Sequence, residues 1–141
     1  MATKEVVAAG FIVFRRIQSQ LQYLIMKHSY GNHWTPPKGH VDPGEGELEA
    51  AYRETFEEAG LSESDLKVFE GCKQTLKYEV KGRPKRVEYW VAELCDPDTP
   101  VRLSHEHETF EWLPLENVLL RAGFQEMQQA FKNVDSFLKA S

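Results

Sequence analysis

Three glutamates on one short stretch constrain this chain more than any other feature of its sequence. Residues 46–59 are rich in helix formers, and Gly60 stands where a left-handed C-cap ends a helix. On that helix Glu54, Glu57 and Glu58 are spaced i, i+3 and i+4, so their carboxylates share one face. Such like-charge pairs each destabilise an isolated helix by about 0.2–0.5 kcal/mol. The cluster is therefore either a solvated acidic face or a site for a cation.

The loop before the helix favours the cation site. Residues 38–45 read KGHVDPGE, with glycines where the backbone turns or approaches a ligand closely. Glu45 adds a carboxylate near the start of the helix. Hard divalent ions prefer oxygen ligands, and Mg²⁺ binds through a few carboxylates while keeping substrate phosphates in its other positions. The loop and the helix together predict a site for a divalent ion and a phosphorylated ligand.

Composition and length are typical of one compact domain spanning residues 1–141, with 41% hydrophobic and 28% charged residues. The net charge of −5 argues against a surface that coats nucleic acid, so we expect no nucleic-acid partner. It does not exclude a phosphorylated small molecule, because metal ions can supply positive charge locally.

The cysteines and the absence of long apolar segments predict an intracellular location. Cys72 and Cys95 lack metal-ligand spacing, which predicts buried free thiols in a reducing compartment. The first residues lack a leader pattern, and no apolar run approaches the ~20 residues of a membrane span. We therefore expect a cytoplasmic protein without membrane contact.

Strand and helix patterns alternate along the chain. The pattern predicts strands over residues 6–16, 23–26, 67–80, 86–95 and 110–113, with a hairpin turn at 81–84. A short helix is predicted over 115–120, beginning at Pro114. A C-terminal amphipathic helix is predicted by apolar residues at helical spacing. These residues are Phe124, Met127, Phe131, Val134 and Leu138. This order indicates an α/β sandwich with a mixed sheet and a helix on each side.

The loop and acidic helix match an extended motif, G-x5-E-x7-R-E-U-x-E-E-x-G-U, in which U is a bulky apolar residue. The matching positions are Gly39, Glu45, Arg53, Glu54, Glu57, Glu58, Gly60 and Leu61. Thr55 departs from the pattern, since it stands at the first U. The segment resembles the signature of the Nudix hydrolase family, and the resemblance implies a Nudix-type α/β/α sandwich over essentially the whole chain.

The resemblance also implies a metal-assisted cleavage of a phosphoanhydride. Divalent ions on Glu54, Glu57 and Glu58 would neutralise phosphoryl oxygens and acidify a bound water. In Nudix enzymes a loop carbonyl, here that of Gly39, often completes the ligand set. The expected cofactor is Mg²⁺, with Mn²⁺ as a substitute.

Arg53 is expected to orient these carboxylates and not to touch the substrate. Its position on the helix places Glu49 and Glu57 one turn away, and the family pattern pairs it also with Glu45. The alternative is a surface ion pair that contributes under ~1 kcal/mol.

The identity of the general base remains open between three glutamates. Resemblance offers Glu58 and Glu54 in the helix, or a glutamate of a later loop, for which we name Glu106 as catalytic residue and metal ligand. The neighbouring His105 and His107 could alternate on a strand surface or form a zinc site with an adjacent acid. Coupled carboxylates titrate as a group, so their pKa values belong to the cluster and not to a single base.

Flanking segments narrow the expected substrate. Residues 33–40, Tyr78 with residues 82–85, and residues 103–107 resemble the animal asymmetrical diadenosine tetraphosphate hydrolases. Those enzymes cleave the dinucleotide to ATP and AMP by attack of water on a phosphorus. The resemblance implies a small-molecule dinucleoside polyphosphate substrate, and we expect a monomer.

Substrate-binding residues are predicted in the same segments. Lys38, His40 and Lys85 could meet the charges of a polyphosphate. Tyr78 and Phe124 could sandwich adenine, since stacking of a base on an aromatic ring is worth about 1–3 kcal/mol. His33 resembles a phosphate-contacting histidine of that group. The alternatives are ordinary core or surface aromatics and a solvated turn lysine, and Trp34 fits packing better than ligand contact.

Three other functions remain compatible with the sequence. A Nudix hydrolase could act instead on a modified nucleoside triphosphate, a diphosphoinositol phosphate or a capped RNA end. A Nudix-shaped module could bind nucleotides without cleaving them, although no carboxylate of the motif is missing. The acidic helix could also be a purely structural, solvated surface.

Overall fold

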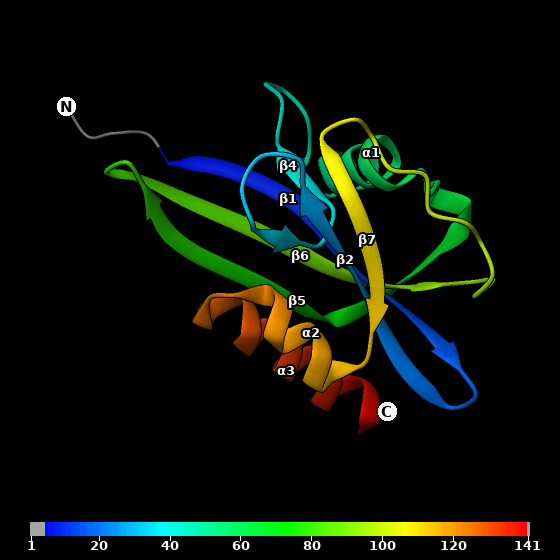
Figure 1. Cartoon of the computed structure of the whole chain (residues 1–141). Helices are drawn as coiled ribbons and strands as arrows, with labels where there is room; N and C mark the ends of the chain where they lie inside the picture. The colour runs from blue at the N-terminus through cyan, green and yellow to red at the C-terminus, as the bar shows by residue number, and fades with distance from the viewer. Residues whose placement is uncertain (1–4, 141) are drawn as a thin grey trace.

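The computed structural model describes residues 5–140. Its strands are β1 (Val6–Ile17), β2 (Gln20–His28), β3 (Trp34–Thr35), β4 (Lys38–His40), β5 (Leu66–Val80), β6 (Arg83–Leu94) and β7 (His107–Leu113). Its α-helices are α1 (Glu47–Ala59), α2 (Leu115–Ala122) and α3 (Gln125–Lys139), and a 3-10 turn covers Glu63–Asp65. The strands form one mixed sheet in the order β3-β2-β1-β6-β5, with β4 beside β1 and β7 beside β2 (Figure 1).

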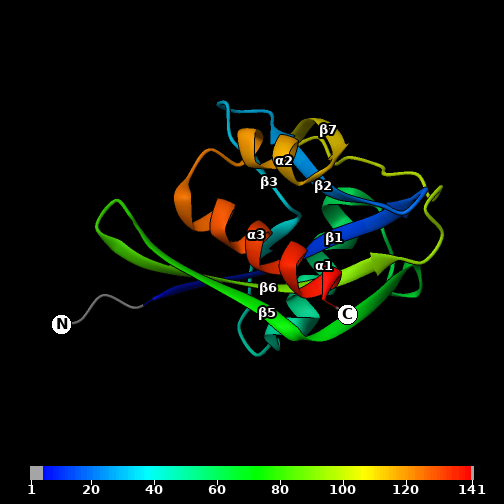
Figure 2. The same cartoon turned by 90° about the horizontal axis from the view of Figure 1, so that it is seen from below.

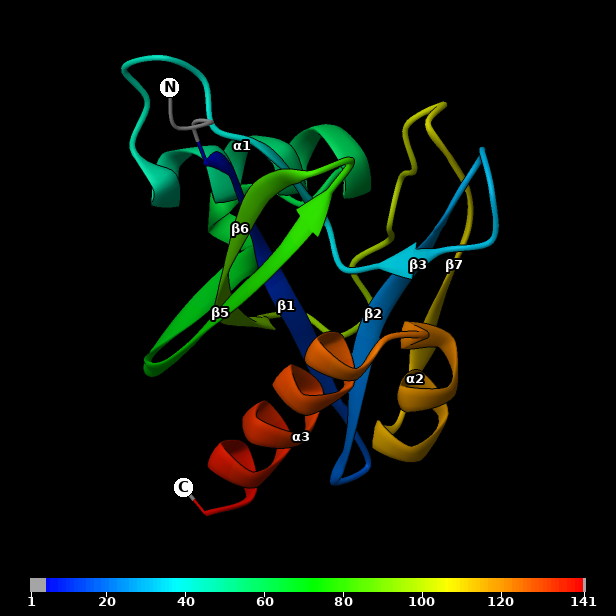
Figure 3. The same ribbon diagram turned by 90° about the vertical axis from the view of Figure 1, so that its left-hand side faces the viewer.

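Helices cover both faces of this sheet. Figure 3 shows α1 on one side of the strands and α2 with α3 on the other. Alternation along the central strand β1 explains the two layers, because Phe11 packs in the core beneath α1 while Ile12 and Phe14 pack in the core with α3. The predicted α/β/α sandwich with a mixed sheet is therefore confirmed. No helix within residues 5–140 is both long and apolar enough to cross a bilayer.

The loop that precedes α1 is anchored in a gap of the sheet. β1 pairs with β2 only near their shared turn, and farther along β3 pairs with β2 while β4 pairs with β1. Phe11 donates its backbone N–H to the Pro37 carbonyl over 3.2 Å. A Cβ at Gly10 would overlap that carbonyl, so only glycine allows this close approach.

β5 and β6 form a long hairpin whose tip extends beyond the helices (Figures 1 and 2). The pairing register shifts between Phe69 and Gln74, which bends β5, and Gly71 lies there at φ +91°. The turn is only Lys81 and Gly82, both with positive φ, so β6 begins at Arg83.

Several predicted strands and one helix were too short, because the elements continue beyond the apolar residues from which they were predicted. Gln18 and Ser19 form a two-residue turn with positive φ, so β2 begins at Gln20 and not at residue 23. β7 begins at His107 and not at residue 110, because it pairs with β2 as far as His28. α2 extends to Ala122, and Pro114 is its N-cap.

Two side chains lie in environments that the pattern did not predict. Phe124 is the N-cap of α3 and is 37% exposed, so it is not on the buried face of that helix. Cys72 and Cys95 are both free, but only Cys72 is buried. Trp34 is packed in the core, as the packing alternative predicted.

Candidate functional site

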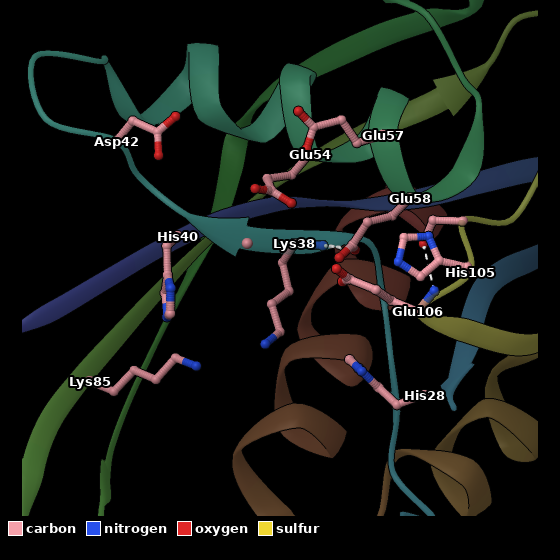
Figure 4. Close-up of a pocket in the computed structure, with 12 residues that line it drawn as sticks. His28, Lys38, His40, Asp42, Glu54, Glu57, Glu58, Lys85, His105 and Glu106 are labelled. Atoms are coloured by element: carbon pink, nitrogen blue, oxygen red, sulfur yellow. Dashed lines mark hydrogen bonds between the residues drawn. The ribbon is translucent and has the colours of Figure 1, made fainter. Parts of the chain in front are cut away.

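A cleft of about 660 Å³ opens between α1, β4 and the loop before β7 (Figure 4). Four glutamates and several cationic or imidazole side chains line it. The lining residues are His28, Lys38, Gly39, His40, Asp42, Glu54, Glu57, Glu58, Lys85, Ser104, His105 and Glu106. The cleft therefore brings together every residue predicted to bind metal: three from α1, one from β4 and one from a distant loop.

Two glycines allow close contacts around α1. A Cβ at Gly39 would overlap the Glu54 carboxylate, so a larger residue there would displace this carboxylate from its place against β4. Gly60 ends α1 as predicted, in the left-handed conformation at φ 71°. A Cβ there would press against Arg102, which begins the segment leading to Glu106.

Glu58 is the most buried of the clustered carboxylates, with 8% exposure. The backbone N–H of Lys38 donates to its Oε1 over 3.0 Å, which fixes the side chain toward the loop. Burial, with smaller contributions from the neighbouring charges of Glu54 and Glu106, raises the pKa of Glu58 to about 7. A carboxyl group with such a pKa can accept or release a proton near neutral pH.

Glu54 and Glu57 occupy different depths of the same cleft. The Glu54 side chain is 14% exposed, and burial raises its pKa although Arg53 Nη1 donates to its Oε1 over 2.8 Å. The Glu57 side chain is 53% exposed and lies 3.3 Å from the same guanidinium. The cluster is thus anchored at its buried end and open to ligand at its exposed end.

Arg53 holds the loop and the helix together. Its Nε and Nη2 donate to both carboxylate oxygens of Glu45, over 2.8 and 3.0 Å, and Nη2 also donates to the His40 carbonyl. These bonds lower the pKa of Glu45 to about 2. The predicted pairing of Arg53 with Glu49 is wrong: within residues 5–140 the two form no ion pair, because the guanidinium turns toward Glu45, Glu54 and Glu57.

The loop carrying Glu106 is hydrogen-bonded to the last turn of α1. Arg102 N–H donates to the Ala59 carbonyl over 2.8 Å, and Ser104 N–H donates to the Glu58 carbonyl over 3.2 Å. In Figure 4, Glu58 and Glu106 approach each other from the helix and from this loop. The structure thus places Glu106, the glutamate predicted from the later loop, in the cleft.

Neither reading of the two histidines beside Glu106 is supported. His105 lines the cleft. His107 is 6% exposed, so it is not a surface residue, and its ring centroid lies 4.7 Å from that of His28. Within residues 5–140 no three His, Cys, Asp or Glu side chains are gathered closely enough to hold an ion as they stand, which argues against a preformed zinc site.

The carboxylate cluster nevertheless fits a hard divalent cation in its chemistry. Four glutamates supply oxygen donors to one cleft. The space left by the missing Cβ of Gly39 brings the Glu54 carboxylate against the loop backbone, where a carbonyl is also available. Burial is the main reason that the pKa values of Glu54 and Glu58 are raised, so their ionised forms would be stabilised by added positive charge. A cation held by Glu54, Glu57, Glu58, Glu106 and the Gly39 carbonyl would supply it.

The buried Glu58 carboxyl predicts that the stability of the metal-free protein depends on pH. Its pKa is about 7 when folded against an ordinary value of 4.5, so its contribution to stability is full below pH 4.5. This contribution is lost as the pH rises through 7, by at most about 3 kcal/mol. Urea unfolding with a chelator should therefore show Glu58→Gln gaining stability over wild type between pH 4.5 and 8. Exposed Glu49→Gln is the control, and a pH-independent difference for Glu58→Gln would contradict this origin.

A second hollow of about 540 Å³ adjoins the cleft and carries the predicted aromatic pair. The rings of Tyr78 and Phe124 lie with centroids 5.9 Å apart at an angle of 60°, so they contact each other edge to face and do not form the predicted sandwich around a base. Lining residues are His28, His33, Thr35, Lys38, Leu76, Tyr78, Glu79, Val80, Lys85, Val87, Tyr89 and Phe124. Its walls are more apolar than those of the cleft, which suits the flat face of a nucleobase. We call it the aromatic hollow.

Three side chains line both the cleft and the aromatic hollow: His28, Lys38 and Lys85. Burial, together with the neighbouring charge of Lys38, lowers the pKa of Lys85 to about 8. Two cations facing each other in this way would be stabilised by an anionic ligand. All six predicted substrate-binding residues line one or both of the two cavities.

Asp42 and His28 are among the cleft residues that sequence reasoning missed. Asp42 offered a signal, because it lies in the loop before α1 and its carboxylate is 3.5 Å from Arg53 Nη2. His28 offered none, since a histidine at the end of a strand is most often a surface residue. Burial and the neighbouring His107 lower its pKa to about 4, so the imidazole is neutral at physiological pH.

Comparison with known proteins agrees with this arrangement. The family model described as NUDIX domain matches residues 4–134, so the chain belongs to the Nudix family, whose hydrolases use divalent metal ions. The resemblance inferred from the acidic helix is thus confirmed.

Particular relatives are similar over almost the whole chain. Bis(5'-nucleosyl)-tetraphosphatase (asymmetrical) of Caenorhabditis elegans is 46% identical over 132 residues, covering 93% of this chain and 95% of the relative. The protein of the same name from Mus musculus is 44% identical over 138 residues, covering 93% and 94%. The crystal structure of a C. elegans Ap4A hydrolase binary complex superposes with a TM-score of 0.93 at 45% identity, covering 96% of this chain and 99% of that chain.

Proposed function

We propose that this chain hydrolyses dinucleoside polyphosphates and cleaves diadenosine tetraphosphate asymmetrically to ATP and AMP. The observation that carries the proposal is the junction between the aromatic hollow and the carboxylate cleft at His28, Lys38 and Lys85. A nucleoside bound in the hollow would extend its phosphate chain past two lysines toward the glutamates. The similarity to two proteins named as asymmetrical tetraphosphatases supports this substrate.

Each part of the site has a distinct task in this proposal. Lys38 and Lys85 neutralise the phosphates that lie between the base and the scissile anhydride. His40, exposed at the other side of the cleft, meets phosphates beyond them. Glu58 is the favoured general base because its pKa of about 7 suits proton transfer near neutral pH. Arg53 contacts carboxylates and not substrate, so it is a positioning residue.

We further propose Mg²⁺ as the metal, with Mn²⁺ as a substitute, held by Glu54, Glu57, Glu58, Glu106 and the Gly39 carbonyl. When bound, the ion would polarise the phosphoryl group and acidify a water molecule. The residues of the cleft would align that water with the phosphorus and exclude competing geometries.

Product analysis in heavy-oxygen water tests this function most directly. Wild-type protein with Mg²⁺ and diadenosine tetraphosphate should yield ATP and AMP, with the heavy oxygen in AMP. A side-by-side panel of a modified nucleoside triphosphate, a diphosphoinositol phosphate and a capped RNA should react more slowly. Two molecules of ADP, or tight binding without products over hours, would refute the proposal, and the second result would indicate a binding module.

Removing the aromatic face of Tyr78 should weaken substrate binding. Tyr78→Ala is expected to raise KM for diadenosine tetraphosphate by about 10- to 100-fold with little change in kcat, because base stacking is worth about 1–3 kcal/mol. Tyr78→Phe keeps the ring and should stay close to wild type. Phe56→Ala is the matched control, since Phe56 is 58% exposed on α1 and lines neither cavity. An unchanged KM in Tyr78→Ala would place the base elsewhere.

A further inference from the structure

A third hollow of about 350 Å³ lies near the tip of the β5–β6 hairpin. Val6, His40, Val80, Lys81, Arg83 and Lys85 line it. Its lining is mostly apolar, and three of its residues, Lys81, Arg83 and Lys85, carry a cationic group. We call it the tip hollow.

The sheet register explains why the tip hollow continues the aromatic hollow. Tyr78 pairs with Lys85, and Val80 pairs with Arg83, so the four side chains project from one face of the hairpin. β1 pairs beside them, with Val6 opposite Lys85. Val80 and Lys85 consequently line both hollows.

The tip hollow also opens onto the carboxylate cleft. His40 and Lys85 line both cavities, and Figure 4 shows these two side chains at the end of the cleft away from His105. By contrast, the hollow at Lys27 and Arg121 and the hollow at Arg16 and Asp135 share no lining residue with the cleft.

A dinucleoside polyphosphate needs such a second hollow. If one base stacks at Tyr78 and the phosphates reach the glutamates, the remaining nucleoside must leave the cleft. The end at His40 leads directly into a hollow with apolar walls for a base and cationic groups for the adjacent phosphate. The phosphate chain would then follow a bend from the aromatic hollow, through the cleft, to the tip hollow.

We propose that the tip hollow binds the second nucleoside of the substrate, which leaves as the nucleoside monophosphate. This inference rests on the proposed dinucleoside polyphosphate hydrolysis and adds a subsite to it. It makes the hairpin tip a determinant of preference for dinucleotides over mononucleotides that carry the same number of phosphates.

Two ligands that differ only in the second nucleoside test the subsite. The KM of diadenosine tetraphosphate is compared with the Ki of adenosine 5'-tetraphosphate as a competitor in the same assay. Arg83→Ala removes a cation at an exposed turn, and Val6→Gln replaces an apolar wall of the hollow. Each should raise the KM of the dinucleotide about three- to tenfold and leave the Ki of the mononucleotide unchanged. Lys77→Ala is the control, because Lys77 is exposed on the opposite face of the hairpin and should change neither constant.

The outcomes separate the subsite from the function on which it rests. If wild type hydrolyses diadenosine tetraphosphate but KM and Ki rise by the same factor, or neither changes in Arg83→Ala and Val6→Gln, the subsite is wrong and the proposed function stands. If wild type does not hydrolyse the dinucleotide at all, the proposed function fails and the subsite fails with it.

Discussion

Replacing Glu58 by glutamine should lower kcat by about 10²–10⁴-fold and leave the fold intact. The amide keeps an oxygen that can accept the Lys38 N–H, now bonded to Glu58 Oε1 over 3.0 Å, so the side chain should keep its position. It cannot take a proton or carry charge, and both are required of Glu58 in the proposed hydrolysis. Steady-state kinetics with diadenosine tetraphosphate and far-ultraviolet circular dichroism measure the two effects.

Matched glutamine variants decide between the three candidate bases. Glu54→Gln and Glu106→Gln should lower kcat less than Glu58→Gln if Glu58 is the base. Glu49→Gln, on the exposed face of α1, should leave kcat near wild type. With Mg²⁺ bound, wild type should lose activity only well below pH 7, because the cation favours the ionised form of Glu58 and lowers its pKa from the metal-free value. Near-normal turnover in Glu58→Gln would remove Glu58 from the chemistry.

Removing divalent ions should lower kcat by at least about 10³-fold. Adding back Mg²⁺ or Mn²⁺ should restore it. The expectation follows from the charge of the cleft, where burial and mutual repulsion raise the pKa of Glu54 and Glu58. The same repulsion between carboxylates predicts that Mg²⁺ stabilises the protein against unfolding even when no substrate is present. At about 100 times its Kd it should raise Tm by about 5–10 °C.

Glutamine variants of the cluster provide the control for metal binding. Glu54→Gln and Glu57→Gln should each reduce the Mg²⁺-dependent rise in Tm, whereas Glu63→Gln, outside the cleft, should retain it in full. Full activity in the presence of chelator, together with a Tm that does not change when Mg²⁺ is added, would show that these carboxylates do not hold a cation.

Local sequence determined the acidic helix and its surroundings. The spacing of Glu54, Glu57 and Glu58 fixes them on one face because helical periodicity is a local property, and Gly60 ends the helix as predicted. Even Thr55, the departure from the motif, is fully buried where the pattern has an apolar residue.

Sequence reasoning failed where two side-chain arrangements fit the local sequence equally well and contacts with distant residues determined which one forms. Glu49 and Glu57 are both one turn from Arg53, but the loop places Glu45 within 2.8 Å of Arg53 and draws the guanidinium away from Glu49. Phe124 continues the apolar spacing of α3, yet the chain is extended there and leaves the ring beside Tyr78. No local pattern distinguishes these outcomes.

The sequence by itself indicated the family through its resemblance to the Nudix motif, and it determined the order of strands and helices and the carboxylate helix through residue periodicity. Only the tertiary structure decided that Glu106 reaches Glu58, that Lys38 and Lys85 lie close together, and that the cleft, the aromatic hollow and the tip hollow meet at Lys85. These arrangements join residues far apart in the chain, and the pairing of β1 with β4 and β6 sets their distances.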